Sequence, residues 1–204
     1  MVKTLIFFLL WGMVSLVFAS EKGEEKFQIE LKAFPPGGGF TLDCAQGKCS
    51  LDDYRGKIVV LFFGYVSCPD ICPTTLQQLQ SAFSLLTPAE QRYVQIAFIT
   101  LDPLRDTPDV LAEYLAFFKL PAAGLSGKAS DIDQVVEQYA GQYRKVAYQG
   151  SALGYGIDHS AAIYLIDRTG RLRTMLRHEI PPAVLALTLR KLLAEHWVSP
   201  GNDD

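Results

Sequence analysis

The sequence predicts an α/β sandwich, in which helices cover a central sheet and a β-hairpin precedes it. Residues 57–66 and 94–99 are apolar without alternation and rich in β-branched and aromatic side chains, which is typical of strands buried on both faces. Apolar residues at spacings of three and four follow each run, as on one face of a helix. The 204 residues are 49% hydrophobic and 20% charged, which suits one domain with a real core and excludes disordered, collagen-like and coiled-coil chains.

The predicted hairpin is formed by residues 40–42 and 49–51, with Gly47 in the turn between them. Near the other end of the chain, a glycine-punctuated loop at 150–156 precedes two further strands. Those strands cover residues 162–166 and 172–176, with a turn between them. The strands 57–66 and 94–99 are expected at the centre of a parallel or mixed sheet.

Helix starts are marked by capping residues and prolines. The expected starts are Pro73, Thr107-Pro108, Ser130 and Pro181-Pro182. Strands therefore alternate with helices, and we expect a thioredoxin-like three-layer sandwich with an added N-terminal β-hairpin. Four aromatic residues on the predicted strands and helices are expected to pack in the core rather than to form a binding surface: Phe62, Phe63, Phe117 and Phe118.

Residues 1–19 have the pattern of a secretory signal peptide or of a membrane anchor. Lys3 precedes an apolar run, and Ala19 provides a small residue before the cleavage point. The run is short for a bilayer span, which favours cleavage. Either interpretation predicts an exported protein, periplasmic if bacterial, and either soluble or anchored to the inner membrane by residues 4–19. In an oxidising compartment, paired cysteines are candidates for disulfides or metal sites.

The remaining chain is divided by composition. We expect a flexible tether at 20–35, the folded domain at 36–198 and a flexible tail at 199–204. Lys and Arg number 19 against 22 Asp and Glu, for a formal net charge of -3, and no segment concentrates the basic residues. Nucleic acid is therefore not an expected partner.

The strongest local motif is a pair of cysteines, Cys68 and Cys72, between a buried strand and a helix start. The carboxyl end of a strand is where α/β proteins place ligands. Cys72 lies at or just before the helix N-terminus, where free amides and the helix dipole stabilise a thiolate. Two such thiolates can form a disulfide or bind a soft metal, and the residue types alone leave both open.

Three motifs resemble the Sco/SenC family of copper proteins. They are GYVSCPDICP at residues 64–73, DPLRDTP at 102–108 and DHS at 158–160. The resemblance implies a thioredoxin-like fold and a copper site formed by Cys68, Cys72 and His159. It also implies a role in assembling the binuclear copper centre of cytochrome c oxidase, with that centre's subunit as partner and with other copper chaperones or thioredoxin-like reductants as further partners.

The implied ligand set agrees with copper chemistry. Two thiolates and an imidazole are soft donors that suit Cu(I), and with one more ligand they can hold Cu(II). Structural zinc sites usually close with four protein ligands, and only three candidates are visible. Thioredoxin-like reductases usually carry a proline near the position of Ala161, and none lies between His159 and Asp167. This departure favours a metal site over a general oxidoreductase.

Polar residues near the three motifs are expected to orient the site or to stabilise its turns. His159 is expected in a loop able to swing toward the cysteines, with Asp158 as a partner that orients it. Asp70 is expected to tune the site electrostatically. Asp102, Arg105 and Asp106 are expected to form a turn in which Arg105 pairs with a carboxylate. Two histidines have structural explanations: His178 near a strand end and His196 in the last helical turn.

Cys44 and Cys49 depart from the family pattern. They lie across the predicted hairpin turn and are expected to face each other directly, close enough for a structural disulfide. The alternative is a second pair for redox chemistry or metal transfer.

Three functions are compatible with the cysteine pair and the implied copper site. The first is a metallochaperone that delivers copper without catalytic turnover. The second is a thiol-disulfide reductase that uses Cys68 and Cys72 on the oxidase copper-site cysteines before the metal enters. The third is a peroxidase-like or redox-signalling protein, which needs only a reactive thiol.

Overall fold

The computed structural model describes residues 37–147 and 153–195. Its main sheet has five strands in the order β5-β4-β3-β8-β9, and β3 at the centre pairs parallel with β4 and antiparallel with β8. The strands are β5 (Ala122–Leu125), β4 (Val94–Thr100), β3 (Ile58–Gly64), β8 (Ala162–Ile166) and β9 (Leu172–Arg177). Every residue of β3 is buried, so the unbroken apolar run correctly predicts a central strand in a mixed sheet.

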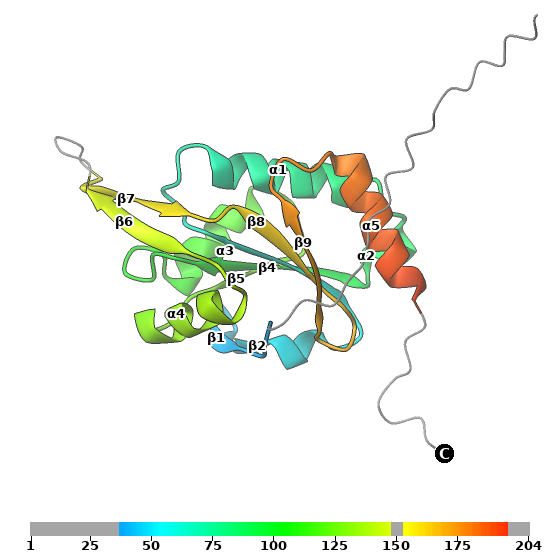
Figure 1. Cartoon of the computed structure of the whole chain (residues 1–204), viewed down its shortest axis with the longest axis horizontal. Coiled ribbons are helices and arrows are strands. Elements are labelled where there is room, and N and C mark those ends of the chain that lie inside the picture. Colours follow the sequence, from blue (N-terminus) through cyan, green and yellow to red (C-terminus); the bar gives the residue numbers. More distant parts are fainter. Residues whose placement is uncertain (1–36, 148–152, 196–204) are drawn as a thin grey trace, which may run out of the picture.

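Helices and the small hairpin complete the layers. In Figure 1, α1 and α5 lie side by side above the sheet, and α4 and the β1–β2 hairpin lie below it. Helix α3 packs against β5. The helices are α1 (Ile71–Ser84), α2 (Pro88–Gln91), α3 (Pro108–Ala116), α4 (Ala129–Gln138) and α5 (Pro182–Ala194). The predicted thioredoxin-like α/β fold with its N-terminal hairpin is confirmed.

Local signals explain where the helices begin. The Thr107 side chain accepts a hydrogen bond from the amide of Val110, and Pro108 is the first residue of α3, as predicted. Helix α1 starts at Ile71, two residues before the expected Pro73. Cys72 therefore belongs to the first turn of α1, where the free amides of the helix end lie.

A second hairpin, which sequence reasoning did not predict, extends from the sheet. Strand β6 (Tyr143–Ala147) pairs antiparallel with β7 (Tyr155–His159), and together they project to the left in Figure 1. Part of the segment expected to be a loop at 150–156 is thus strand. The short strand β5 and the one-turn helix α2 were also not predicted.

Three of the four aromatic residues expected in the core lie there, but Phe117 does not. Phe62, Phe63 and Phe118 are almost fully buried, whereas the Phe117 side chain is 79% exposed. Helix α3 ends at Ala116, so Phe117 is its C-cap. Successive residues at a helix end point in different directions, and Phe118 takes the inward position.

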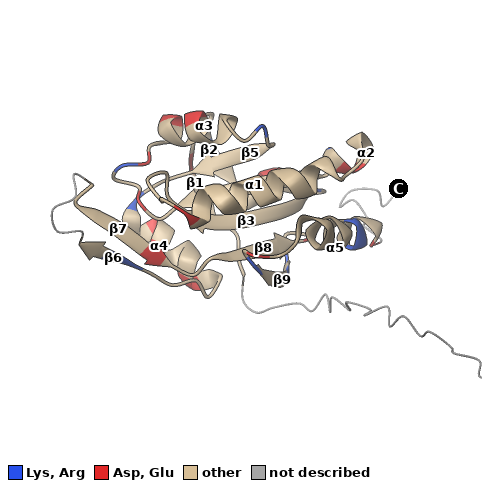
Figure 2. Cartoon of the chain, turned by 90° about the horizontal axis from the view of Figure 1, so that it is seen from above, with Lys and Arg blue, Asp and Glu red and all other residues tan. Residues whose placement is uncertain are grey.

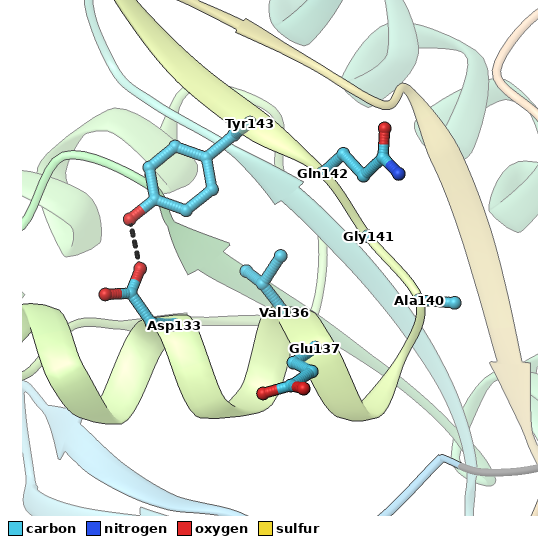
Figure 3. A pocket seen from close by; sticks show the side chains of 7 residues that line it. All are labelled: Asp133, Val136, Glu137, Ala140, Gly141, Gln142 and Tyr143. Atoms are coloured by element: carbon cyan, nitrogen blue, oxygen red, sulfur yellow. Dashed lines mark hydrogen bonds between the residues drawn. The ribbon is translucent and has the colours of Figure 1, made fainter.

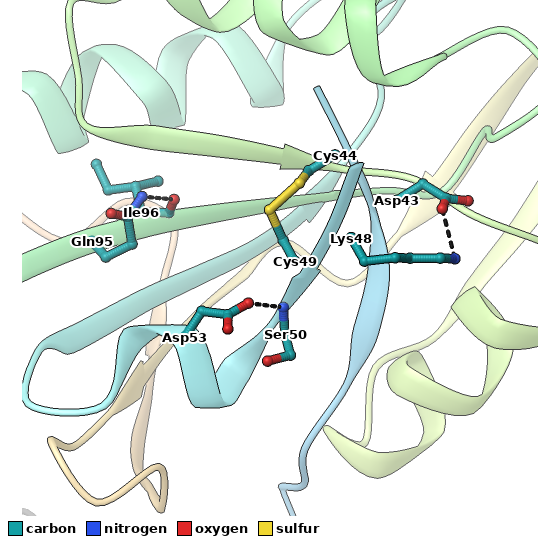
Figure 4. The surroundings of a disulfide bond; sticks show 8 residues. All are labelled: Asp43, Cys44, Lys48, Cys49, Ser50, Asp53, Gln95 and Ile96. Atoms are coloured by element: carbon teal, nitrogen blue, oxygen red, sulfur yellow. Dashed lines mark hydrogen bonds and ion pairs between the residues drawn. A yellow bond between two sulfur atoms is a disulfide. The ribbon is translucent and has the colours of Figure 1, made fainter. Parts of the chain in front are cut away.

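The N-terminal hairpin holds a disulfide between Cys44 and Cys49, with Cα atoms 5.9 Å apart (Figure 4). Its strands are β1 (Thr41–Cys44) and β2 (Gly47–Ser50), and a 3₁₀ turn, Leu51–Tyr54, follows. The two cysteines had been expected to lie directly opposite each other, and this expectation was wrong. Cys44 pairs with Gly47 and Cys49 with Leu42, so the bond runs diagonally across the ladder.

Charged residues are distributed over the outer elements. Figure 2 shows acidic residues on α3 and α4 and basic residues on α5 and β6. Within residues 37–147 and 153–195, no helix is long and apolar enough to cross a membrane. The predicted signal or anchor at 1–19, the tether up to residue 35, the tail at 199–204 and His196 lie outside the described residues.

We predict that replacing both hairpin cysteines, Cys44→Ala with Cys49→Ala, lowers the free energy of unfolding by about 2 kcal/mol, because the bond restricts a short loop of the unfolded chain. Urea denaturation under oxidising conditions measures the change. Metal stoichiometry is expected to stay at the wild-type value, because Cys44 is buried in the core cluster as part of a structural bond. An unchanged midpoint and slope would contradict a stabilising role.

Candidate metal centre

The two cysteines lie where β3 gives way to α1. Cys68 is partly exposed in the connecting loop, and Cys72, in the first turn of α1, is fully buried. The Cys72 amide donates a hydrogen bond to the Cys68 sulfur at 3.5 Å. The N-terminus of α1 thus directs a backbone amide toward the sulfur of Cys68 and places the sulfur of Cys72 in the buried interior.

Gly64 makes room for the buried sulfur. A Cβ atom at this last residue of β3 would lie 2.8 Å from Cys72 Sγ and 2.9 Å from the Phe98 ring. Both distances are shorter than a van der Waals contact allows. Glycine at this position is therefore required for α1 to seat Cys72 against the sheet, a role that sequence reasoning did not assign.

His159 reaches the cysteines from the end of β7. Its Nε2 lies 3.7 Å from Cys72 Sγ, and the three ligand atoms of Cys68, Cys72 and His159 are all within 4.8 Å of one another. The structure therefore brings together the three residues expected to bind metal. The expectation of a loop histidine was wrong, because His159 is paired with Tyr143 in a regular antiparallel ladder.

One of the distances among the three candidate ligand atoms matches the spacing of a metal site. Donors at about 2.0–2.3 Å from one ion in a trigonal arrangement lie roughly 3.5–4 Å apart. The separation of 3.7 Å between Cys72 Sγ and His159 Nε2 falls in this range. Two sulfurs and one imidazole nitrogen constitute a soft donor set, which fits a thiophilic metal such as Cu(I).

A backbone carbonyl orients the imidazole of His159. Its Nδ1 lies 3.2 Å from the carbonyl oxygen of Ser160. In the tautomer that carries its proton on Nδ1, that proton is donated to the Ser160 oxygen and Nε2 is free to bind a metal. Asp158, expected to orient the ring, instead makes an exposed ion pair with Arg144 at 2.9 Å. Side chains alternate along a strand, so neighbours 158 and 159 face opposite ways.

The two thiols differ in acidity. The pKa of Cys68 is lowered to about 3, first by a hydrogen bond with the Cys72 thiol and then by His159 and by the amides of Asp70 and Cys72, against the effect of burial. The pKa of Cys72 is raised by the same hydrogen bond to Cys68 and by burial. Cys68 is therefore the thiolate and Cys72 the thiol, and the thiolate is the more accessible of the two.

An open cleft of about 320 Å³ leads to the site. It is lined by Tyr65, Cys68, Pro69, Asp70, Ile71, Ile157, Asp158 and His159. Asp70 is exposed at its rim and contributes its backbone amide to the Cys68 sulfur. The Tyr65 ring, almost fully buried, meets the His159 ring edge-on at 6.2 Å. Tyr65 was not singled out from the sequence.

The acidic turn after β4 has the scaffold role that was expected. Asp102 and Asp106 are buried, and Arg105 forms an ion pair with Asp102. Neither carboxylate belongs to the cluster of Cys68, Cys72 and His159.

Within the described residues, the other histidine, His178, and a second hollow lie apart from the metal centre. His178 follows the end of β9, as expected, and is outside the cluster. The hollow between α4 and the start of β6 is lined by polar groups such as Asp133, Glu137 and Tyr143 (Figure 3). The Tyr143 hydroxyl donates to Asp133 there, which fastens the base of the β6–β7 hairpin to α4.

Comparison with known proteins places this geometry in a family. The family model described as SCO1/SenC matches residues 30–194. The chain belongs to the SCO1/SenC family. The SCO2-like protein RP587 of Rickettsia prowazekii (strain Madrid E) is 35% identical over 165 residues, which is 79% of each chain.

Solved Sco structures have the same fold. Apo Sco1 of Thermus thermophilus superposes with a TM-score of 0.71 at 32% identity, covering 81% of this chain and 98% of that one. Bradyrhizobium japonicum ScoI with copper bound superposes with a TM-score of 0.69 at 34% identity, covering 77% and 99%. The resemblance drawn from the three motifs is thereby confirmed.

We predict that iodoacetamide modifies Cys68 at least about tenfold faster than Cys72 in the reduced, metal-free protein, because Cys68 is accessible and ionised. The rate at pH 6 is expected to stay close to that at pH 8, since a thiol with a pKa well below 6 is ionised at both. An ordinary cysteine loses about tenfold per pH unit below its pKa of about 8.5. Peptide mapping by mass spectrometry measures both rates, and equal labelling of the two cysteines would contradict the assignment.

We predict that Gly64→Ala lowers the free energy of unfolding by about 1–3 kcal/mol, because the new methyl group displaces Cys72 Sγ and the Phe98 ring. The site is expected to lose metal affinity in parallel. Gly39→Ala is the matched control, because a Cβ atom there meets nothing within 4 Å. Denaturant titration and metal titration of both variants measure the effects. Equal behaviour of the two would show that Gly64 has no such role.

Proposed function

We propose that this protein binds one copper ion through Cys68, Cys72 and His159 and delivers it to the binuclear copper centre of cytochrome c oxidase during assembly. The observation that carries the proposal is the convergence of two sulfurs and one imidazole nitrogen within 4.8 Å at the end of an open cleft. Such a soft set suits Cu(I), and a fourth ligand entering through the cleft suits Cu(II). The similar structure of Bradyrhizobium japonicum ScoI, which has copper bound, supports copper as the metal.

The site favours transfer over permanent storage. Cys68 and His159 line the cleft, while Cys72 is buried behind them. A ligand of the receiving subunit enters beside Cys68 and exchanges with its sulfur first. Exchange of the Cys68 and Cys72 thiols with a disulfide of another protein forms a Cys68–Cys72 disulfide and passes two electrons and two protons to that protein, which leaves with two thiols. Both sulfur ligands are then lost, so redox state controls copper loading.

The compartment follows from the same proposal. Residues 1–19 export the chain, and the copper domain then works in the periplasm of a bacterium, soluble or held at the inner membrane by residues 4–19. Its partners are the copper-centre subunit of the oxidase, copper chaperones that supply the metal and thioredoxin-like proteins that reduce Cys68 and Cys72.

A second candidate function is reduction of the oxidase copper-site disulfide. The accessible thiolate of Cys68 with the buried thiol of Cys72 behind it is the arrangement that favours this reading. Cys68 attacks a target disulfide to form a mixed disulfide, and Cys72 then displaces the target as two thiols. The protein ends as a Cys68–Cys72 disulfide, which a dithiol reductant must reduce again.

We predict that the reduced protein binds one equivalent of Cu(I), and that Cys68→Ser and His159→Ala lower the affinity by at least about 100-fold, because each removes a donor. Titration against a competing chelator, with native mass spectrometry for stoichiometry, measures this. His178→Ala is the matched control, since His178 lies outside the cluster. Unchanged affinity in His159→Ala would overturn the three-donor site. If that variant loses copper but keeps its thiol exchange with a model disulfide, the two functions are separable.

A further inference from the structure

We propose that the turn Asp102–Asp106 is a two-ended clamp that sets the distance between His159 and the two cysteines. The inference rests on the proposed copper site and concerns residues that do not touch the metal. One end of the turn holds the cysteine loop, and the other end holds the β6–β7 hairpin that carries the histidine. We call these five residues the clamp.

The first end is the carboxylate of Asp106, which is 1% exposed. It accepts a hydrogen bond from the amide of Val66 at 3.0 Å and another from the hydroxyl of Thr100 at 2.7 Å. Val66 lies two residues before Cys68 in the loop that leaves β3. A buried carboxylate is strongly destabilised without such donors, so this contact fixes where the cysteine loop begins.

The second end is formed by Asp102 and Arg105. Asp102 is fully buried and accepts a hydrogen bond from the Tyr155 hydroxyl at 2.7 Å. The guanidinium of Arg105, paired with Asp102, donates to the carbonyl oxygens of Leu153 at 3.2 Å and Tyr155 at 3.3 Å. It also lies 4.0 Å from the centre of the Tyr155 ring, and Lys145 lies 4.8 Å from the same centre. The Lys145 ammonium, on β6, also lies 4.0 Å from an Asp102 carboxylate oxygen, so both strands of the hairpin contact this end.

Strand β7 connects the anchored Tyr155 to His159. Side chains of a strand alternate, so Tyr155, Ile157 and His159 lie on the same face of β7. The amide of Ile157 donates to the hydroxyl of the buried Tyr65 at 3.3 Å. His159 follows two residues later and places its ring edge-on against Tyr65. The contacts of Tyr155 and Ile157 thus fix the position of β7, and with it the position of His159 relative to the cysteines.

The turn itself joins its two ends. The carbonyl oxygen of Asp102 accepts hydrogen bonds from the amides of Arg105 at 3.0 Å and Asp106 at 2.9 Å. The hydroxyl of Thr100, which donates to Asp106, also accepts from the amide of Asp102 at 2.9 Å. The Ser126 hydroxyl donates to the Asp106 carbonyl at 2.8 Å. A displacement at one end therefore moves the other, which relates the cysteine loop to a strand more than 80 residues away in the chain.

The test uses Asp102→Asn and Tyr155→Phe in the full-length reduced protein. Tyr155→Phe keeps the aromatic ring under Arg105 and removes only the hydroxyl, so it serves if Asp102→Asn does not fold. We expect both to bind one Cu(I) with affinity lowered about tenfold or more, as for other residues that orient a ligand. The Cu(II) spectrum is expected to move toward that of His159→Ala. Arg144→Ala is the matched control, because it removes an exposed ion pair from the same hairpin.

A double-mutant cycle separates positioning from a general structural effect. In the His159→Ala background, Asp102→Asn is expected to change copper affinity by less than about twofold, because the ligand it positions is gone. The same tenfold loss in both backgrounds would overturn the clamp.

Hydrogen exchange of the metal-free protein tests the clamp without copper. Amides of residues 155–159 are expected to exchange about tenfold faster in Tyr155→Phe than in Arg144→Ala. Unchanged exchange would overturn the clamp even if copper binds. Faster exchange in a protein whose wild type binds no copper would instead overturn the proposed function and leave the hairpin anchor standing.

Discussion

The approach of His159 to the buried sulfur of Cys72 is the contact on which the rest of the site depends. The two atoms lie 3.7 Å apart and come from residues that are far apart in the chain. Gly64 must lack a side chain so that the sulfur can sit against β3, and Tyr65 must be buried so that its hydroxyl and ring meet β7. Helix α1 and strand β7 thus meet at the carboxyl end of the central strand, where α/β folds place ligands.

The two cysteines differ in burial and therefore in their chemical roles. Backbone amides at the start of α1 donate hydrogen bonds to the accessible sulfur of Cys68, whereas Cys72 is packed in the interior. An accessible thiolate suits both exchange of a metal ligand and attack on a disulfide. The histidine is therefore the residue that distinguishes the metallochaperone from the reductase, since thiol exchange needs two sulfurs and the proposed copper site uses the nitrogen as well.

Much of the framework was predictable because buried strands and capped helices carry local signals. The central strand, the capped start of α3 and the N-terminal hairpin are all found as expected. The β6–β7 hairpin was missed, because Gly154 and Gly156 suggest a loop and conceal the alternation of Tyr155, Ile157 and His159 along one face. Phe117 was misplaced because it follows the last residue of α3 as its C-cap, and hydrophobicity alone does not show which residue at a helix end faces the core.

The sequence by itself determined the chemistry of this protein: two cysteines at a strand-to-helix junction, the DHS motif and the acidic turn identify the family and the types of ligand. Only the tertiary structure decided how these groups are oriented. It directs Asp158 away from the His159 ring and gives that ring the carbonyl of Ser160. It also connects the turn at 102–106 to both halves of the site. Residue type is local information, whereas orientation depends on long-range strand pairing and on the burial of polar groups that must find partners.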